Sequence, residues 1–406
     1  MRIAIVTETF LPSVDGVVTR LTRAVERFTA LGHEVLVIAP DLGVTEHAGA
    51  RVIGMPTVTL PFYRHRKFAL WNRRVDAILR GFGPDVVHAA QPILLASSAA
   101  RAAVRQDVPL VASYHTHLPR YMELYPAWRW GIPAVWWQIR RMHALADVNV
   151  VTSEAMREEL SGHGIERLRV LRRGVDTASH HPRFASAAMR DRLTDGEPGR
   201  TLLVYVGRLA AEKEIQSLRP MMDRRDDVAL AIVGDGPYRA QLEETFRGTR
   251  TVFPGFLRGE ELASAFASAD AFIFPSVTET LGLVILEGMA SGLPVVAARS
   301  GPTMEQVRDG VTGLLYDGGP GAAAQASLDA ALDRLADADA MAAIRAEARA
   351  EAEMFSWEAA SDDLLAVYEE AIAVHQHDNS DAVGTCRMMA FTTLTTRFER
   401  RSASSI

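Results

Sequence analysis

Short apolar runs recur along the first half of the chain, separated by longer segments in which apolar residues follow helical periodicity. Each run is rich in β-branched residues, as expected for a strand of a parallel sheet that helices cover on both faces. Helical segments such as Val17–Ala30, which Gly32 would terminate, and Val135–Ala146 lie between them. The pattern predicts an α/β fold with a doubly wound sheet, whose strands are Ile3–Thr7, Val35–Ala39, Val86–His88, Leu110–Tyr114 and Asn149–Thr152.

The alternation pauses around residues 177–200, a segment with no apolar run that resembles a strand. It resumes with a second set of predicted strands: Thr201–Val206, Val228–Val233, Ala271–Pro275, Val295–Ala298 and Leu314–Tyr316. We therefore expect two doubly wound, Rossmann-like domains, residues 1–176 and residues 177–355. Because ligands of open parallel sheets bind beyond the carboxyl ends of the strands, the two domains would face each other across one cleft.

The end of the chain has a different composition. Ala322–Ala352 is alanine-rich and favours helix. Ser356 is a plausible N-cap for a last helix over residues 356–374, which we expect to pack back on the first domain. Residues 375–406, rich in Thr, Ser and Arg near their end, are predicted to be a disordered tail.

Composition excludes several classes of protein. The 406 residues are 48% hydrophobic and 23% charged, which is typical of globular chains. The net charge of −6 argues against a broad basic surface, so no nucleic-acid partner is expected. The single cysteine, Cys386, permits neither an internal disulfide nor a cysteine-based zinc site. A reducing, cytoplasmic location is the natural interpretation, since neither a signal peptide nor a spanning apolar run is recognisable.

Glycine-rich turns follow several predicted strands. The turn that ends at Gly16 leads from the first strand into a helix, where glycine lets backbone N–H groups approach an anion, although most such turns are only structural. Gly234 and Gly236 begin a dinucleotide-binding pattern, but Arg239 occupies the place of its third glycine. No Walker A pattern is present, so a nicotinamide oxidoreductase and a P-loop enzyme are both disfavoured.

Two basic residues follow the first strand of the second domain. Gly207 ends this strand, and Arg208 and Lys213 come after it. An arginine fork and a lysine point charge together suit a diphosphate group. The alternative is a solvated basic pair on the surface, but the position at a strand end favours an anion site.

The strongest pattern is a pair of glutamates, Glu279 and Glu287, with seven residues between them. We expect Glu279 in the loop before a helix and Glu287 inside that helix, about 12 Å further along. The N–H groups near Gly282 and Leu283 would point the helix N-terminus at phosphates between the two carboxylates. The alternative is one exposed glutamate on an amphipathic helix, which the apolar neighbours of Glu287 disfavour.

His115 and His117 end a strand of the first domain. A His-x-His pair suggests metal, yet no third ligand is evident, so no metal site is predicted. We expect His115 to line the cleft as a hydrogen-bonding group or proton carrier, the alternative being a core histidine.

Basic and aromatic residues are interleaved over residues 64–74, and six Tyr and Trp residues crowd residues 119–137. The first cluster suits an anionic bilayer surface, or else an ordinary solvated segment. The second suits an acceptor groove, or else a helix packed into the core.

Together these motifs resemble the retaining glycosyltransferases of the GT-B fold, the family 4 glycosyltransferases with a Glu–seven–Glu motif. The similarity covers residues 1–374 and is greatest toward sulfoquinovosyldiacylglycerol synthases and GDP-mannose-dependent α-mannosyltransferases. Its carriers are the Gly16 turn, His115, residues 172–176, 206–213 and 233–237, the glutamate motif and residues 290–298. Two departures concern Pro302, where the family has a glycine, and Arg172-Arg173 before Gly174.

The resemblance implies a role for each matched residue. Arg208 and Lys213 would hold the diphosphate, and Glu287 the ribose hydroxyls. Glu279 would contact the donor sugar near its anomeric carbon, helped by backbone N–H groups of residues 280–283, which include Gly282 and Leu283. His115 would also contact the donor sugar. Gly16 would let the first loop approach the phosphates and the acceptor, and the family needs no metal.

We therefore predict a retaining hexosyltransferase that uses a UDP- or GDP-sugar as co-substrate and needs no cofactor. The acceptor would be a hydroxyl of a glycolipid, of the diacylglycerol type, or of a small molecule. Peripheral contact with the inner face of the membrane would accompany a lipid acceptor. Alternatives are a sugar-nucleotide epimerase or phosphorylase of the same fold and a non-catalytic sugar-nucleotide-binding protein.

Overall fold

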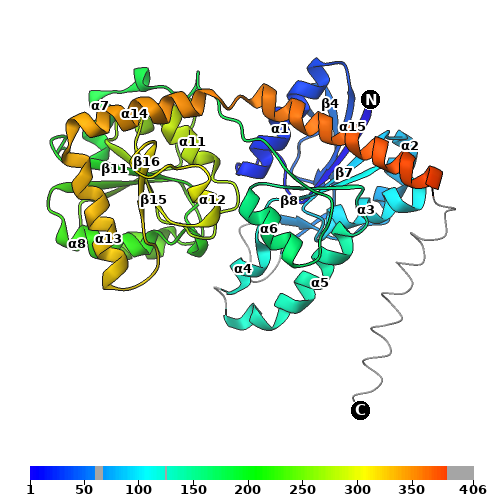
Figure 1. Cartoon of the computed structure of the whole chain (residues 1–406), viewed down its shortest axis with the longest axis horizontal. Coiled ribbons are helices and arrows are strands. Elements are labelled where there is room, and N and C mark those ends of the chain that lie inside the picture. Colours follow the sequence, from blue (N-terminus) through cyan, green and yellow to red (C-terminus); the bar gives the residue numbers. More distant parts are fainter. Residues whose placement is uncertain (60–66, 124–125, 382–406) are drawn as a thin grey trace, which may run out of the picture.

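Two separate parallel sheets organise the computed structural model, which describes residues 1–59, 67–123 and 126–381 (Figure 1). The first sheet lies within residues 2–170 and the second within residues 201–316. Helices pack on both faces of each sheet. The predicted fold class, α/β with two doubly wound sheets, is confirmed.

Within the described residues, the first sheet has eight strands in the order β10-β9-β8-β7-β1-β2-β4-β3, and only the β3–β4 pair is antiparallel. The topology reverses between β1 and β7, and ligands of such sheets bind at this point, beyond the carboxyl ends. A small antiparallel pair, β5 (Thr57–Thr59) and β6 (Lys67–Ala69), forms a separate sheet whose β6 contacts β2. The eight strands are β1 (Arg2–Thr7), β2 (Glu34–Pro40), β3 (Glu46–His47), β4 (Ala50–Met55), β7 (Val86–Ala90), β8 (Leu110–Tyr114), β9 (Val148–Val151) and β10 (Leu168–Val170).

Helices from distant parts of the chain enclose the first sheet. Its core on one face includes Phe28 of α1 (Gly16–Ala30) and Tyr368 of α15 (Trp357–Asp381). The core on the other face is formed with α2 (Arg74–Phe82), α3 (Leu95–Gln106) and α5 (Ile132–His143). The first domain also contains α4 (Leu118–Glu123) and η1 (Pro126–Gly131), which pack against α5, and α6 (Glu154–Gly162), which packs against β9 and β10.

The second sheet has six parallel strands in the order β13-β12-β11-β14-β15-β16, so its topology reverses between β11 and β14. These strands are β11 (Thr201–Val206), β12 (Val228–Val233), β13 (Thr251–Gly255), β14 (Ala271–Phe274), β15 (Val295–Ala298) and β16 (Gly313–Tyr316). Its helices are α7 (Ala187–Leu193), α8 (Arg219–Arg224), α9 (Arg239–Thr245), α10 (Gly259–Ala267), α11 (Leu283–Ala290), α12 (Gly301–Met304), α13 (Ala322–Asp333) and α14 (Ala338–Glu353). Short 3₁₀ turns η2 (Pro182–Phe184), η3 (Ala211–Lys213), η4 (Ile215–Leu218) and η5 (Arg334–Ala336) connect them.

Helix α15 returns the chain to the first sheet (Figure 1). Ser356 caps it, since its hydroxyl accepts the N–H of Ala359 at 3.0 Å. The Tyr368 hydroxyl reaches His88 Nδ1 in the sheet at 2.8 Å. The helix extends through Asp381, so the prediction of a helix that ends at residue 374 and of disorder from residue 375 was wrong for residues 375–381. His375 is buried there beside Asp147, which explains why the helix continues.

The remaining differences between the predicted and the observed elements concern segments whose hydrophobic pattern is weak. All ten predicted strands are present within one residue or two of their expected bounds, but the edge and peripheral strands β3, β4, β5, β6, β10 and β13 were missed. These strands are short or partly exposed, so they lack a continuous apolar run. The alanine-rich stretch from residue 322 forms two helices, α13 and α14, with a break around Asp337, which caps α14.

Candidate active site

The predicted site residues come from the carboxyl ends of both sheets. Gly16 begins α1 after β1, and His115 directly follows β8. The other sheet contributes Arg208 after β11, Lys213 in η3, and the loop and helix that carry the two glutamates after β14. The two sides touch, because a Cβ on Gly16 would lie 3.5 Å from Leu283 Cδ1 and the Thr280 hydroxyl donates to the His115 carbonyl at 2.6 Å.

Glu279 and Lys213 form an ion pair at the centre of the site, and their side chains are only 15% and 14% exposed. Burial alone would raise the pKa of Glu279. The charge of Lys213, its hydrogen bond and the N–H groups of Thr280 and Leu281 outweigh this effect, so the pKa lies below its ordinary value of 4.5. Glu279 is therefore ionised at neutral pH and held in one orientation.

Arg208 is oriented by a second ion pair. Its guanidinium contacts the buried carboxylate of Glu212, four residues further along the chain. The Glu212 carbonyl in turn accepts hydrogen bonds from the hydroxyls of Ser276, at 2.9 Å, and Thr278, at 2.8 Å. The loop that carries the cations is thus fastened to the loop that carries Glu279, which keeps both in one place.

Glycines bring a third loop against the cation loop. A Cβ on Gly234, whose φ is +138°, would lie 1.9 Å from the Gly207 carbonyl oxygen. One on Gly236 would lie 2.3 Å from the Leu209 carbonyl oxygen. Because only glycine fits at both positions, the Gly-Asp-Gly segment supports the Arg208 loop. The sequence excluded this segment as a dinucleotide fingerprint without assigning it this structural role.

Helix α11 begins at the site, as predicted. Gly282 precedes it in the left-handed conformation, with φ of +60°, and Gln306 Nε2 steadies the turn through the Leu281 carbonyl at 2.8 Å. Among the described residues, the N–H groups of Gly282 and Leu283 have no hydrogen-bond acceptor. They are therefore available to an anion at the helix N-terminus, whereas those of Thr280 and Leu281 are directed to Glu279.

Glu287 lies one turn into α11 and differs from Glu279 in its surroundings. Within the described part of the chain, its carboxylate has no hydrogen-bond or ion-pair partner. Burial raises its pKa above the ordinary 4.5, and His180 only partly opposes this effect. A half-buried carboxylate without a donor is costly, which is typical of a group that binds a ligand.

The two histidines have different environments, and neither lies on a strand. His117 is fixed by protein, because its Nε2 contacts Glu159 Oε1 at 2.6 Å and its Nδ1 accepts the N–H of Arg120. His115 is buried, and neither of its ring nitrogens has a hydrogen-bond partner among the described residues. Burial, with the nearby charge of Arg20, holds the pKa of His115 well below its usual range.

The lowered pKa keeps the His115 ring uncharged at neutral pH, with one N–H to donate and one ring nitrogen to accept a hydrogen bond, which favours the predicted hydrogen-bonding role over that of a proton carrier. In the described ranges, no three His, Cys, Asp or Glu side chains are grouped so that they could hold a metal ion. His117 is committed to Glu159, so the His-x-His pair does not converge on one point.

Polar residues that the sequence analysis passed over also end strands of the first sheet. Gln91, after β7, accepts the N–H groups of His115 and Thr116 through its Oε1 at 2.7 and 2.8 Å. Glu8, after β1, accepts three N–H groups at the start of α3 at 2.8–3.1 Å. Glu8 directly follows the predicted strand Ile3–Thr7, and Gln91 is the first polar residue after the predicted strand Val86–His88, so a search for the first polar residue beyond each strand would have found both.

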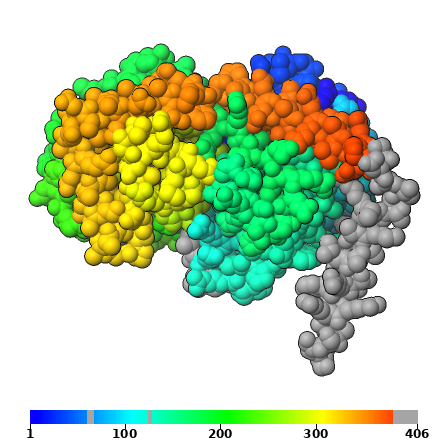
Figure 2. Space-filling model, viewed as in Figure 1, coloured from blue at the N-terminus to red at the C-terminus, as the bar shows by residue number. Residues whose placement is uncertain are grey.

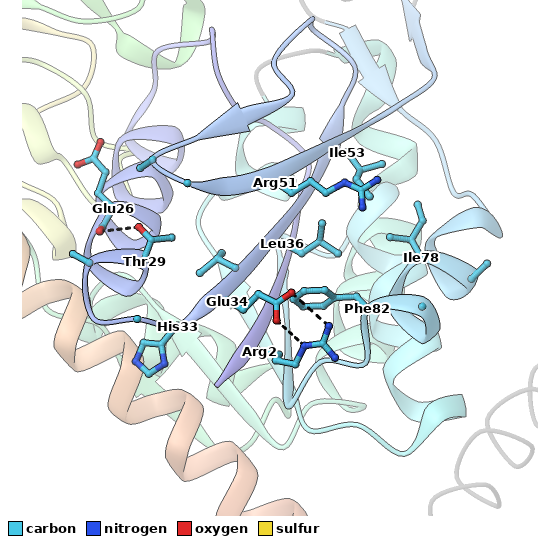
Figure 3. Close-up of a pocket in the computed structure, with 17 residues that line it drawn as sticks. Arg2, Glu26, Thr29, His33, Glu34, Leu36, Arg51, Ile53, Ile78 and Phe82 are labelled. Carbon is cyan, nitrogen blue, oxygen red and sulfur yellow. Dashed lines mark hydrogen bonds and ion pairs between the residues drawn. The ribbon is translucent and has the colours of Figure 1, made fainter.

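The described residues of the first domain line two cavities of interest. One of about 310 Å³ adjoins the predicted cleft, since it is lined by residues that follow β1 and β2 and by Lys67. Another, of about 1200 Å³, lies at the amino ends of β1 and β2, where Arg2 pairs with Glu34 (Figure 3). None of the predicted site residues lines the second cavity, and ligands of parallel sheets bind at the opposite, carboxyl ends.

The aromatic stretch is divided between core and surface. Trp136 stacks on His163 at 3.6 Å, whereas Trp130 on η1 is 84% exposed. Trp137 is partly exposed beside Arg141, and Trp71 lies beside Arg73. Residues 64–66 of the basic cluster lie outside the described residues. No helix in the described ranges has the length and apolarity needed to span a membrane.

Comparison with known proteins identifies the class. The model "Glycosyltransferase Family 4" matches residues 14–179, and "Glycosyl transferases group 1" matches residues 200–334. A GDP-mannose-dependent alpha-mannosyltransferase of Mycolicibacterium smegmatis is 36% identical over 92% of this chain and 98% of its own length. The chain therefore belongs to the family 4 glycosyltransferases, and its resemblance to that family is confirmed.

One further sequence relative and one solved structure are also similar to this chain. Sulfoquinovosyl transferase SQD2 of Arabidopsis thaliana is 41% identical over 75% of this chain, and the match spans 61% of the SQD2 length. The sucrose-phosphate synthase of Thermosynechococcus elongatus is 21% identical with a TM-score of 0.74, covering 92% of this chain and 99% of that structure. That structural similarity supports the GT-B fold. The named relatives favour sugar transfer over the epimerase, phosphorylase and non-catalytic alternatives.

Proposed function

We propose that this glycosyltransferase moves a sugar from a nucleoside-diphosphate sugar to a hydroxyl of a glycolipid-type acceptor, with retention of anomeric configuration and without a metal. The observation that carries the proposal is the arrangement around α11. Its N-terminus has acceptor-free N–H groups, two cations lie in the facing loop, and the unpartnered Glu287 follows one turn later. This set matches a diphosphate flanked by a ribose.

In the proposed reaction, the bond between the anomeric carbon and the diphosphate oxygen breaks while the acceptor oxygen bonds to the same face of that carbon. The acceptor proton passes to the departing diphosphate. Arg208, Lys213 and the N–H groups of Gly282 and Leu283 stabilise the charge that develops on the leaving group. Glu279 and the neutral His115 would contact the donor sugar near the reacting carbon. These charges would take the place of a metal ion.

The first domain offers the acceptor side. The cavity of about 310 Å³ lies beside the Gly16 loop and combines Glu8 with Lys67, so it suits a polar head group that bears hydroxyls. The family relatives include an Alpha-monoglucosyldiacylglycerol synthase of Streptococcus pneumoniae, 27% identical over 78% of this chain. These two observations favour a lipid acceptor over a soluble one.

Membrane contact would follow from a lipid acceptor. The exposed Trp71, Trp130 and Trp137, with Arg73 and Arg141 against two of them, suit the interface of an anionic bilayer. Vesicle sedimentation with phosphatidylglycerol-containing and neutral vesicles tests this proposal. Trp130→Ala with Trp137→Ala should weaken binding at low salt, while Met354→Ala, which removes an exposed apolar side chain at the end of α14, should not.

The decisive experiment is a donor and acceptor screen with purified protein and chelator present. UDP- and GDP-sugars are compared for protection against thermal unfolding, because a ligand at 100 times its Kd stabilises the folded state by about 2.7 kcal/mol. Each protecting donor is then offered diacylglycerol in vesicles and a soluble alcohol. Transfer to neither acceptor, transfer that requires added metal, or a product with inverted configuration would contradict the corresponding part of the proposal.

A further inference from the structure

Thr280 stands between the two domains at the point where their catalytic groups meet. Its hydroxyl donates to the His115 carbonyl at 2.6 Å, and its own carbonyl accepts the Thr152 hydroxyl at 2.8 Å. His115 and Thr152 belong to the first domain, whereas Thr280 belongs to the second and is the chain neighbour of Glu279. Thr280 thus donates one hydrogen bond to the first domain and accepts another from it.

These two bonds are buried. Thr280 is 2% exposed, and Thr152 is fully buried. A buried hydroxyl or carbonyl that loses its partner costs more than the bond itself contributes. The bonds therefore favour the arrangement in which the domains are in contact, and they fix the distance between the Glu279 and His115 loops.

A second contact lies beside the first. The carboxylate of Glu305, which follows α12, accepts the N–H groups of Glu154 and Ala155 at 3.0 and 2.8 Å, and so caps α6 of the opposite domain. Arg173 donates to the same carboxylate at 3.1 Å. Helices α12 and α6 lie next to each other at this seam (Figures 1 and 2).

The fit at this seam is close. A Cβ on Gly301, the first residue of α12, would lie 2.6 Å from Ala155 Cβ. The Glu305 cap and the Thr280 bonds belong to one continuous surface, because Gln306, the neighbour of Glu305, holds the Leu281 carbonyl beside Thr280. A change at either contact is therefore transmitted to the loop that presents Glu279.

We infer that Thr280 is a positioning residue, a latch that holds the two domains together and thereby aligns Glu279 with His115, with Glu305 as its second fastening. The latch acts through hydrogen bonds within the protein, from the Thr280 hydroxyl to the His115 carbonyl and from the N–H groups of Glu154 and Ala155 to the Glu305 carboxylate. It acts by setting the fraction of molecules in which the donor side and the acceptor side are assembled. The inference rests on the proposed roles of Glu279 and His115.

The variants separate the hydroxyl from the shape of the side chain. Thr280→Val removes the donor to His115 at nearly constant volume, and Thr280→Ser restores it. Glu305→Gln weakens the second fastening while preserving size. Thr312→Val is the matched control, because this fully buried hydroxyl accepts the N–H of Arg308 at 2.9 Å within one domain.

Distances between spin labels report the closure directly. Labels at Ala77→Cys and Gln241→Cys, two exposed positions in opposite domains, are introduced in a Cys386→Ser background. One net hydrogen bond shifts a two-state equilibrium by about two- to tenfold. Thr280→Val and Glu305→Gln should each reduce the short-distance population by such a factor, whereas Thr280→Ser and Thr312→Val should leave it unchanged.

Kinetics supply the second measurement. Nucleotide Kd should change by less than about twofold in Thr280→Val, because the side chains expected to bind the diphosphate and the ribose, those of Arg208, Lys213 and Glu287, lie in the second domain. The rate at saturating donor should fall by about two- to tenfold and recover in Thr280→Ser. An unchanged label distance in Thr280→Val, or a loss that serine does not restore, would overturn the inference. If the wild type transfers no sugar, the proposed function fails, while the label distances still test the latch.

Discussion

The pKa values of the two glutamates of the motif are shifted in opposite directions. Replacing each glutamate by glutamine should therefore change the stability of the fold in opposite directions. Glu287 has no partner in the described structure, and its pKa is raised above 4.5. The folded state therefore binds a proton that the unfolded state has released, and stability falls as the pH rises from 4.5 through the folded pKa. Glu287→Gln removes this penalty and should raise the Tm at pH 7.

Glu279 behaves in the opposite way. Its pKa is lowered, so its contribution is present above pH 4.5 and is lost as the pH falls through the folded pKa. Glu279→Gln leaves the ammonium of Lys213, 14% exposed, without its counter-charge. We expect a loss of about 1–3 kcal/mol, the cost of an unsatisfied partly buried group, and a fall in Tm of about 2–4 °C per kcal/mol.

Ligand binding separates the two residues again. If Glu287 holds the ribose, the Glu287→Gln variant loses a charge-assisted hydrogen bond of about 1.5–3 kcal/mol. This loss weakens nucleoside diphosphate binding by about 10- to 150-fold. Glu279→Gln should reduce turnover more than nucleotide binding, since Glu279 is expected to contact the sugar.

The assays are calorimetric titration with UDP and GDP and thermal unfolding of the same preparations at pH 5 and pH 7. Gln241→Ala, a substitution at an exposed position of α9, serves as the control and should leave both the Tm and the nucleotide Kd unchanged. If Glu287→Gln lowers the Tm, the reasoning about the unpartnered carboxylate is refuted. If its nucleotide Kd stays within twofold of the wild type, the ribose assignment is refuted instead.

Three further predictions concern the supports of the site. Gly234→Ala places a Cβ 1.9 Å from the Gly207 carbonyl oxygen, so it should lower both the Tm and the nucleotide affinity; unchanged values in the two titrations would contradict this packing. Burial raises the pKa of Glu8 to about 7, so this carboxyl should make stability fall between about pH 4.5 and pH 7, and urea unfolding of Glu8→Gln should show a flatter pH profile than the wild type. His115→Asn should reduce transfer with a small change in Tm, whereas His117→Asn, which breaks the contact with Glu159, should lower the Tm. Both quantities are measured on both variants; a larger fall in Tm for His115→Asn than for His117→Asn would contradict these assignments.

The fold was predictable because its central strands are buried on both faces. Runs such as Val228–Val233 and Leu110–Tyr114 have no solvent-facing side and therefore carry an unbroken apolar pattern. Strands at the margin, such as β10 with its exposed Arg169, do not carry this pattern. The extension of α15 to Asp381 depends on the contact between His375 and Asp147, residues far apart in sequence, and local composition contains no sign of it.

The candidate site was predictable to different degrees on its two sides. The donor side consists of contiguous motifs, because one strand, one loop and one helix carry Glu279, Gly282 and Glu287 together. Residues that are close in the sequence of this motif are therefore also close in the folded site. The partnership of Lys213 with Glu279, by contrast, joins two βα loops and was visible only in the structure.

The acceptor side and the seam between the domains consist of single residues that follow different strands. Glu8 and Gln91 look like ordinary polar residues in turns, and Thr152 looks like the end of a predicted strand. Each acquires a role only when the sheet brings the strand ends together. A donor diphosphate has a fixed geometry that a local motif can match, whereas the acceptor side is assembled from separate loops. This difference explains why the reaction class can be predicted from the sequence, whereas the acceptor side becomes visible only in the folded structure.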